Sequence, residues 1–230
     1  MSDNLISIVL PVYNQADHIG EIVDKYEEAM KRVPIPHEFI MLVNNSRDES
    51  LRVCNQLAEK YDSIKVVHSE QGGWGLAVNV GLQHCTGSIV GYTNSARTSP
   101  EDLVLCLLYA IANPGTVIKA NRYVRENFKR RVGSLLYNVE VRALFDLPYW
   151  DVNGTPKVFP KEFDKLLSLQ CQNDLIDAEF NAVCREEGYP MLEVPILRAE
   201  RHSGISTTTM RSAFKLYWGV YQLWRERRNK

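Results

Sequence analysis

Hydrophobic and polar positions alternate along the first half of the chain in blocks that predict strands and helices in turn. Leu5 to Val12 is an apolar run rich in β-branched residues, typical of a strand buried on both faces of a parallel sheet. Ala16 to Lys31 repeats apolar residues at helical spacing, with charged residues on the opposite side. The same succession continues with strands at 39–43, 64–68 and 88–92, and with helices at 50–61, at 76–82 and from Pro100.

Strands and helices joined by short connections predict an α/β fold, a doubly wound and mainly parallel sheet flanked by helices. Four of the predicted strands are followed by polar or glycine-rich loops, at 13–15, 44–48, 72–75 and 93–98. Ligands bind beyond the carboxyl ends of the strands in such sheets. We therefore expect these loops to line one crevice, the alternative being that they are plain connecting turns.

The second half of the chain is less regular. It predicts a strand at 117–120, a turn-rich strand segment at 150–159 with Asn153-Gly154 as its bend, a helix at 175–187 and a strand at 191–196. A last helix begins at Thr209. The chain length suits one domain, residues 1–206, followed by a C-terminal amphipathic helix at 207–230.

Composition narrows the class of protein. A formal net charge of −1 argues against a broad nucleic-acid-binding surface. Five cysteines without CxxC spacing are typical of reduced, mostly buried thiols in a cytoplasmic protein. The N-terminus does not resemble a signal peptide, and no stretch approaches the roughly 20 apolar residues of a membrane-spanning helix. We expect a cytoplasmic protein, with any membrane contact peripheral and at the cytoplasmic face.

Five segments occur in an order that is more specific than any one of them. They are residues 7–14 (SIVLPVYN), 42–48 (LVNNSRD), 151–159 (DVNGTPKVF), 177–179 (DAE) and 193–196 (EVPI). This set resembles family 2 of the inverting glycosyltransferases with the GT-A, Rossmann-like fold, particularly the polyprenyl-phosphate sugar transferases of the dolichyl-phosphate mannose synthase type. The resemblance implies that a sugar passes with inversion from a nucleotide-sugar donor to a lipid-phosphate or other acceptor, in polysaccharide or glycolipid biosynthesis. Together with the loops expected to line the crevice, it gives these candidate donor contacts: Pro11, Tyr13, Asn14, Asn44, Asn45, Gly73, Gly75, Asn94, Ser95 and Arg97.

Two departures from the family pattern concern negative charge. The family carries an Asp-x-Asp pair after the fourth strand, where this chain has Thr93-Asn94-Ser95, and acidic residues after the second strand, where it has Asn44-Asn45. Neutral side-chain oxygens hold a divalent cation weakly, so we assign no metal ligand, although Mg²⁺ or Mn²⁺ stays open as a cofactor. Arg97 and the backbone N–H groups of 72–75 are candidates to offset the diphosphate charge instead. The alternative is that Arg97 is a solvated loop residue.

The catalytic candidates are Glu179 and Asp177, with Asp151 as a third. The spacing of Asp177 and Glu179 places them on different faces of a helix, so we expect one of them to point into the crevice. The alternative is that both are surface charges. If the acceptor is a lipid phosphate, its oxygen is already anionic and no strong base is required.

The acceptor candidates are mainly basic. By the same resemblance they are Arg122, Arg125, Arg130, Arg131, Asn153, Lys157, His202 and Ser203. The basic stretch around 122–131 also contains Lys129. Its charge pattern is equally consistent with acceptor binding and with a solvated helix face. Residues 201–206 resemble a family loop that closes over the donor, with Gly204 permitting closure.

The last helix carries aromatic residues on one stripe, surrounded by arginine and lysine. This pattern fits a helix at an anionic membrane surface. It also fits a helix docked on its own domain or on a second copy of the chain.

Three functions remain open from the residues. The first is a nucleotide-sugar-dependent glycosyltransferase. The second is a non-catalytic binding protein on the same fold, motivated by the loss of both acidic turns. The third and weakest is a nucleotidyltransferase, for which no Walker-type lysine loop is found.

Overall fold

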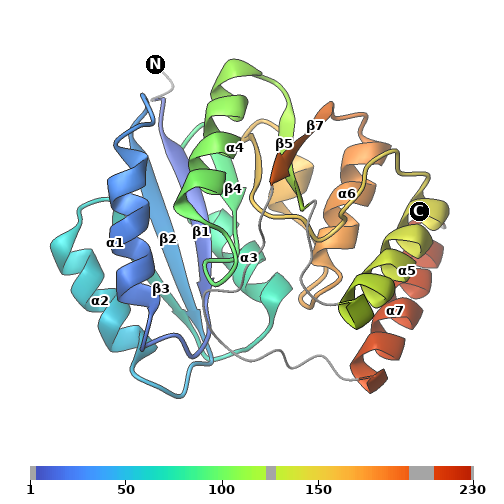
Figure 1. The fold of residues 1–230 in the computed structure, drawn as a ribbon, viewed down its shortest axis with the longest axis horizontal. Helices are drawn as coiled ribbons and strands as arrows, with labels where there is room; N and C mark the ends of the chain where they lie inside the picture. Colours follow the sequence, from blue (N-terminus) through green and yellow to red (C-terminus); the bar gives the residue numbers. More distant parts are fainter. Residues whose placement is uncertain (1–3, 123–127, 197–209, 229–230) are drawn as a thin grey trace.

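The computed structural model describes residues 4–122, 128–196 and 210–228, and these form one mixed sheet with helices on both faces (Figure 1). The strands are β1 (Ile6–Val12), β2 (His37–Asn44), β3 (Ile64–Ser69), β4 (Ile89–Tyr92), β5 (Val117–Arg122), β6 (Lys157–Pro160) and β7 (Met191–Ile196). The helices are α1 (Ile19–Met30), α2 (Ser50–Lys60), α3 (Trp74–Gln83), α4 (Pro100–Ala112), α5 (Phe128–Phe145), α6 (Ile176–Glu186) and α7 (Met210–Arg228), with a 3₁₀ turn η1 (Asp164–Leu167).

The sheet has the strand order β3-β2-β1-β4-β6-β5-β7. The pairs β1–β2, β2–β3, β1–β4 and β5–β7 are parallel, whereas β6 is antiparallel to both β4 and β5. The first residue of β6, Lys157, lies opposite the last residue of β4, Tyr92. The chain therefore enters β6 from the carboxyl edge of the parallel strands, which is the lower edge of the sheet in Figure 1.

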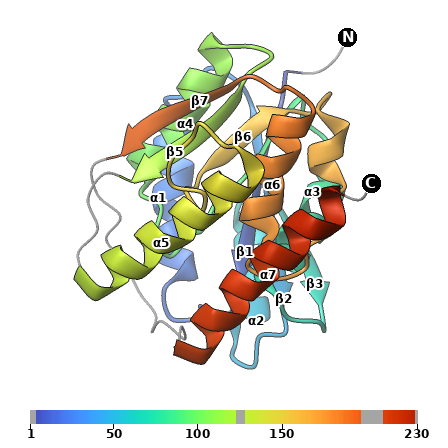
Figure 2. The same cartoon turned by 90° about the vertical axis from the view of Figure 1, so that its right-hand side faces the viewer.

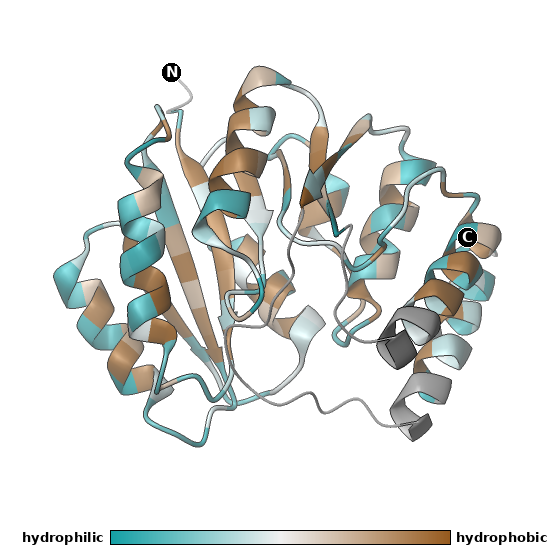
Figure 3. Cartoon of the chain, viewed as in Figure 1, coloured by the Kyte–Doolittle hydropathy of each residue, from teal (hydrophilic) through white to brown (hydrophobic). Residues whose placement is uncertain are grey.

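Side-chain alternation along the central strands divides the interior into two layers. Ile6, Ile8, Leu10 and Val12 of β1 face the cluster shared with α1, α2 and α4, whereas Val9 faces the cluster formed with α3 and α6. Figure 3 shows β1 and β2 largely apolar and the loops at the lower edge largely polar. The doubly wound α/β sheet expected from the sequence is thus confirmed, and polar side chains gather where its parallel strands end.

A third apolar cluster lies between α5, α6 and α7. Val220 and Leu223 of α7 are buried there against Tyr137 and Val141 of α5 and Ala178 of α6. Figure 2 shows α5 and α7 running beside each other across one side of the molecule. The inner face of α7 is therefore docked on its own domain, and the division at residue 206 stays a prediction. No helix in the described parts of the chain has the length and apolarity to cross a membrane.

One local prediction, the bend at Asn153-Gly154, needs correction. The turn before β6 has its corner at Val152-Asn153, because Gly154 N–H donates to Asp151 O (2.7 Å) across it. Gly154 lies after the corner. That position requires glycine because a Cβ there would lie 1.9 Å from Ala120 O. The five cysteines are free thiols as expected, and Cys171 alone among them is not fully buried.

Candidate active site

The loops after β1 and β2 are locked together by hydrogen bonds at the carboxyl edge. Asn14 N–H donates to Ser46 Oγ (3.1 Å), and Arg47 N–H donates to Asn14 Oδ1 (2.8 Å). Asn14 and Asn45 both have φ of 49°, a left-handed conformation that asparagine tolerates better than most residues. Next to them Tyr13 is exposed, whereas Pro11 is buried inside β1. The two predicted donor loops are therefore brought together and shaped by asparagine side chains.

Gln15 joins these loops to the loop after β4. Its Oε1 accepts a hydrogen bond from Ser95 Oγ (3.0 Å), and its backbone N–H donates to Ser50 Oγ (2.8 Å). Gln15 was predicted to lie in a turn, without a role in the site. A glutamine offers a donor and an acceptor at the end of a long side chain, which is the feature that suits it to bridge separate loops.

The glycine loop, residues 72–75, lies beside Asn44. Asn44 Nδ2 donates to Gly73 O (3.2 Å), and a Cβ on Gly72 would lie 3.2 Å from Asn45 Nδ2. Asn44 is 4% exposed, and its Oδ1 has no hydrogen-bond partner among the described residues. All four predicted donor loops thus meet at one edge of the sheet, as expected.

The loop at Thr93–Ser95 does not fit a tightly bound divalent cation. Thr93 Oγ1 shares a hydrogen bond with Thr98 Oγ1 (2.7 Å), Asn94 Oδ1 accepts from Ala96 N–H (3.1 Å), and Ser95 Oγ donates to Gln15. These oxygens are neutral and already hydrogen-bonded, whereas Mg²⁺ and Mn²⁺ favour free carboxylates. Within the described residues no group of three or more histidine, cysteine or acidic side chains could hold a metal. Arg97 follows in the same loop, partly buried.

Asp177 lies at the centre of a buried polar cluster beneath these loops. It accepts hydrogen bonds from Tyr92 Oη (2.8 Å) and from Lys157 Nζ, and Lys157 is fully buried. Burial lowers the pKa of Lys157 and the nearby Asp177 charge opposes that shift, while burial and Asp177 together raise the pKa of Tyr92. Asp177 and Lys157 therefore neutralise each other.

Two further ion pairs adjoin this cluster. Arg122 forms a bidentate pair with Asp151, its Nε and Nη2 each 2.6 Å from a carboxylate oxygen. Lys119 is fully buried and lies 2.9 Å from Glu193 Oε1. Burial would lower the pKa of Arg122, but Asp151 outweighs burial and raises it. The charges of Arg122 and Lys157 are thus engaged within the protein, which does not favour their predicted role in gripping an acceptor.

Glu179 is enclosed rather than open to the crevice. It is 1% exposed, and its oxygens accept from the backbone N–H groups of Gln170 (2.9 and 3.0 Å) and Cys171 (2.7 Å). An acceptor hydroxyl cannot reach this carboxylate without breaking those contacts. Asp177 and Glu179 are both buried, so the alternative that they are surface charges is wrong. Their catalytic role stays a prediction that the geometry does not favour.

Asp174, which was not among the predicted site residues, lies just before α6. It is solvent-exposed, yet partial burial and the charge of Asp177 raise the pKa of its carboxyl group. Asp174 directly follows Asn173, whose backbone O lies close to Gly75 of the glycine loop, so an exposed carboxyl group stands beside the candidate site. The sequence offered a faint signal, an acidic residue in a polar loop preceding a helix.

The remaining acceptor candidates are only partly placed. Asn153 Oδ1 is buried without a hydrogen-bond partner among the described residues. Arg130 and Arg131 lie in the first turn of α5, although their side chains are not described. Arg125, His202 and Ser203 lie outside the described residues, as does the loop at 201–206.

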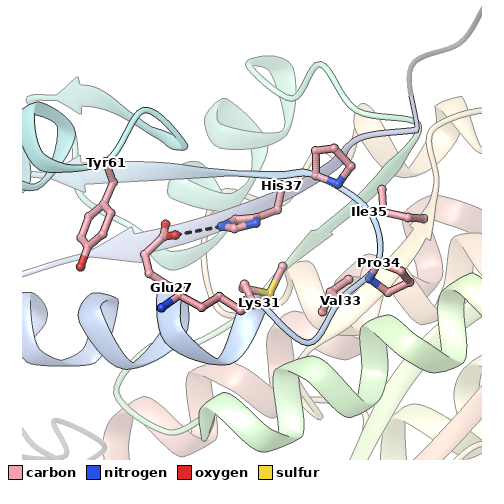
Figure 4. A pocket seen from close by; sticks show the side chains of 9 residues that line it. Glu27, Lys31, Val33, Pro34, Ile35, His37 and Tyr61 are labelled. Carbon is pink, nitrogen blue, oxygen red and sulfur yellow. Dashed lines mark hydrogen bonds and ion pairs between the residues drawn. The ribbon is translucent and has the colours of Figure 1, made fainter.

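An open hollow of about 510 Å³ lies at the opposite, amino edge of the sheet. Figure 4 shows His37 facing Glu27 there, 3.2 Å apart, with Tyr61 and Pro34 on the rim. His37 is the first residue of β2, so this hollow is separated from the carboxyl-edge loops by the length of the strands. It is not the candidate site.

The family model "Glycosyl transferase family 2" matches residues 7–167, which is more than half of the chain. The chain belongs to glycosyl transferase family 2. The match includes the interlocked loops after β1 and β2, the glycine loop and Thr93–Ser95, so it covers the loops of the candidate site.

Curated relatives extend this likeness beyond the family model. The undecaprenyl-phosphate 4-deoxy-4-formamido-L-arabinose transferase of Pseudomonas fluorescens (strain Pf0-1) is 26% identical over 208 residues, 87% of this chain and 59% of that protein. The protein of that name from Sodalis glossinidius is 22% identical over 225 residues, 96% of this chain and 68% of that protein. The chain thus spans about three-fifths of the length of the Pseudomonas relative.

Solved structures share the fold. Glucosyl-3-phosphoglycerate synthase from Mycobacterium tuberculosis, in complex with Mn²⁺, UDP-glucose and phosphoglyceric acid, has a TM-score of 0.70 at 18% identity, covering 95% of this chain and 77% of that chain. Mannosyl-3-phosphoglycerate synthase from Rubrobacter xylanophilus has a TM-score of 0.71 at 20% identity, covering 96% of this chain and 73% of that chain. The architecture is therefore the GT-A fold.

Proposed function

We propose that this chain transfers a sugar, with inversion, from a nucleotide-sugar donor to a polyprenyl-phosphate acceptor. The observation that carries the proposal is that the three carboxylates predicted for catalysis are already engaged. Asp151 binds Arg122, Asp177 binds Lys157 and Tyr92, and Glu179 binds two backbone N–H groups. A site of this kind suits an acceptor that brings its own anionic nucleophile.

A phosphate monoester supplies such a nucleophile, because its oxygen is ionised at neutral pH and attacks without giving up a proton. The names of the curated relatives, which act on undecaprenyl phosphate, support this class of acceptor. In the transfer the acceptor oxygen forms a bond to the anomeric carbon. The bond from that carbon to the nucleoside diphosphate breaks, and the diphosphate leaves with the electron pair.

The leaving diphosphate needs positive charge or N–H donors around it. We propose that Arg97 and backbone N–H groups of the glycine loop provide them in place of a tightly held cation, because the loop at Thr93–Ser95 offers neutral oxygens. A guanidinium group can bind phosphate oxygens in a bidentate manner.

The test is a donor panel of UDP- and GDP-sugars with undecaprenyl phosphate in detergent, each with and without EDTA. We expect turnover with at least one donor that persists in EDTA, and Arg97→Ala should lower kcat/KM roughly tenfold to a hundredfold with folding intact. Activity abolished by EDTA would overturn the cation-independent version. Absence of both donor binding and turnover would favour the non-catalytic alternative.

Asp174 supports a second candidate, transfer to a hydroxyl acceptor with Asp174 as the base. The observation in its favour is position, since Asp174 is solvent-exposed and follows Asn173, whose backbone contacts the glycine loop at Gly75. Asp174→Asn separates the two candidates. Transfer to a phosphate acceptor should be nearly unchanged in this variant, whereas transfer to a hydroxyl should fall by about a hundredfold or more.

We also propose a peripheral contact with anionic membrane through α5 and α7, which would bring the site to a lipid acceptor. Each helix leaves an apolar stripe outside, Leu135, Leu136 and Val139 on α5, and Trp218 and Tyr221 on α7. Arg225 and Arg228 extend the α7 stripe, and the Arg228 guanidinium lies 5.3 Å from the Trp224 ring centre. Aromatic and basic residues side by side are typical of helices at a lipid headgroup layer.

A further inference from the structure

Glu179 holds a turn of the backbone that is distant in sequence from the donor loops. Its two oxygens accept the N–H groups of Gln170 and Cys171 at 2.7–3.0 Å, in a position that is 1% exposed. A buried carboxylate accepting several backbone N–H groups fixes their orientation strongly, because losing it would leave each donor unsatisfied. Glu179 therefore determines where the segment 170–173 lies.

Arg227, near the end of α7, reaches the same carboxylate from outside. Its Nη1 lies 3.3 Å from Glu179 Oε1, while its Nε and Nη2 bind Glu186 at 2.9 and 2.5 Å. Glu186 is on α6, so the arginine fastens α7 to α6 and at the same time balances the buried charge of Glu179. The position of α7 is thereby linked to that of the turn.

The segment 170–173 supports the glycine loop. Leu76 N–H donates to Gln172 O (2.9 Å), and Asn79 Nδ2 donates to Cys171 O (3.1 Å). The backbones are so close that a Cβ on Gly73 would lie 2.6 Å from Gln172 O, and one on Gly75 2.4 Å from Cys171 O. A shift of the 170–173 segment must therefore displace the glycine loop.

The glycine loop in turn contacts Asn44, whose side-chain amide donates to Gly73 O. We propose that Arg227 and Glu179 are positioning residues that couple the docking of α7 to the shape of the donor pocket. The inference rests on the proposed function for the claim that a nucleotide binds at this loop. The contacts of Glu179 are thus with the backbone N–H groups of Gln170 and Cys171, which suits a positioning residue.

The chain contains a matched control for this coupling. Arg185 lies on α6, as Glu186 does. Its Nη2 donates to Asp146 Oδ2 (2.5 Å) and its Nε donates to the Asp146 backbone O (3.0 Å). Neither hydrogen bond involves Glu179. Arg185→Gln therefore removes one arginine–carboxylate pair at the α6 surface, whereas Arg227→Gln removes such a pair, with Glu186, and also the contact with Glu179. Arg227→Lys serves as the conservative variant, since it keeps the charge but loses the bidentate contact.

The experiment compares these three variants with the parent chain in two measurements. Hydrogen–deuterium exchange of the ligand-free proteins reports the N–H groups of Gln170, Cys171 and Leu76. Titration with UDP and GDP, in solution without lipid, reports the donor-site Kd. We expect Arg227→Gln to accelerate exchange at all three N–H groups and to raise Kd roughly threefold to tenfold. Arg185→Gln should leave the exchange rates and the Kd unchanged. Arg227→Lys should give exchange rates and a Kd between those of the parent chain and of Arg227→Gln.

Three outcomes would overturn the coupling. One is faster exchange confined to Gln170 and Cys171, another is faster exchange at Leu76 with an unchanged Kd, and the third is an equal effect of Arg185→Gln. Failure of the proposed function is recognised separately, as a parent chain that binds neither nucleotide. In that case the exchange at Leu76 still decides whether α7 positions the glycine loop.

Discussion

Lys157 and Asp177 are buried together where β4, β6 and α6 meet, Lys157 completely and Asp177 to 5% exposure. Such a pair contributes little net stability over two apolar residues, but removing one partner leaves an uncompensated buried charge. The pair therefore acts mainly on specificity, by fixing the antiparallel β6 against the start of α6.

Lys157→Met should consequently destabilise the protein by about 3–5 kcal/mol in urea unfolding at pH 7. The double variant Lys157→Met, Asp177→Leu should recover part of that loss, because no charge remains. Lys25→Met provides the control, since the Lys25–Glu21 pair on α1 is exposed and its loss should not be measurable. A Lys157→Met protein as stable as this control would show that Asp177 is not buried as described.

Glu38, at the amino edge, illustrates a charge whose role is structural. It accepts hydrogen bonds from Lys65 Nζ (2.5 Å), Ser7 Oγ (2.5 Å) and the Thr86 N–H and Oγ1 (both 2.8 Å), which join three strands to the loop before β4. Burial alone would raise the pKa of Glu38, but these hydrogen bonds outweigh it and lower the pKa to about 2.

The lowered pKa of Glu38 determines how the free energy of unfolding depends on pH. Because the folded pKa of about 2 lies below the ordinary 4.5, the stabilisation is present above pH 4.5 and is lost as the pH falls toward 2. Glu38→Gln should lower the free energy of unfolding by about 2 kcal/mol at pH 7, and the difference from the parent should shrink below pH 4.5. A difference independent of pH from 7 to 3 would contradict this account.

At the scale of single residues, the sequence predicted which loops meet at the candidate site better than it predicted the contacts of the acidic residues. Asn44, Asn45 and the glycine loop follow predictable strands, so their meeting at one edge could be foreseen. The engagement of Glu179 could not, since its partners at 170–171 belong to a loop without a sequence pattern. Asp174 and Gln15 were missed because their roles depend on neighbours from other loops.

Among the elements, the glycine loop shows most clearly how backbone proximity dictates sequence. A Cβ at Gly75 would lie 2.4 Å from Cys171 O and 2.6 Å from Asn173 O, distances that require one backbone to move. The glycine is therefore required by contact with the 170–173 segment, independently of any ligand.

Gly75→Ala should lower stability by about 1–3 kcal/mol and weaken nucleotide binding, because the glycine loop must shift. Gly133→Ala is the matched control: a Cβ there meets nothing within 4 Å, and alanine in a helix should be neutral or stabilise by about 0.5–1 kcal/mol. Thermal unfolding measures the stability of both variants, and nucleotide titration measures their affinity. Equal behaviour of the two would refute the proposed steric conflict.

The boundaries of the elements in the first half of the chain followed well from periodicity, whereas the bounds of α5 and the direction of β6 did not. The segment 150–159 was predicted to contain a strand, and Lys157–Pro160 forms one. Its antiparallel direction arises because the chain, after α5, returns at the carboxyl edge of the sheet rather than crossing to the amino edge. Strand direction in such a case depends on tertiary packing of α5, for which the basic sequence of that helix gave no indication.

At the scale of the whole molecule, α5 and α7 give one side of the protein a character different from the rest. Their inner faces close the third apolar cluster, and their outer stripes keep Leu136 and Trp218 more than half exposed. The sequence allowed a helix docked on the domain or one at a membrane. The docked face is confirmed, and lipid contact by the outer face stays a proposal.

Sedimentation with vesicles containing anionic phosphatidylglycerol tests that proposal. The parent chain should pellet with them and be released by high salt, and Trp218→Ser, Tyr221→Ser should lower the bound fraction by about fivefold or more. Leu108→Ser, Tyr109→Ser on α4 is the control, because those side chains are similarly exposed on another helix. Equal pelleting of both double variants would remove α7 from membrane binding.

The strand order has a consequence for synthesis at the ribosome. β1 to β4 are mutual neighbours, so they can pair as soon as they leave the exit tunnel. β5 cannot, since its two neighbours, β6 and β7, are both translated after it. At about 5–20 residues per second, Val117–Arg122 waits several seconds with unpaired backbone on both sides. During that interval a nascent chain of this protein is most exposed to misassembly, and a chaperone would find its target at β5.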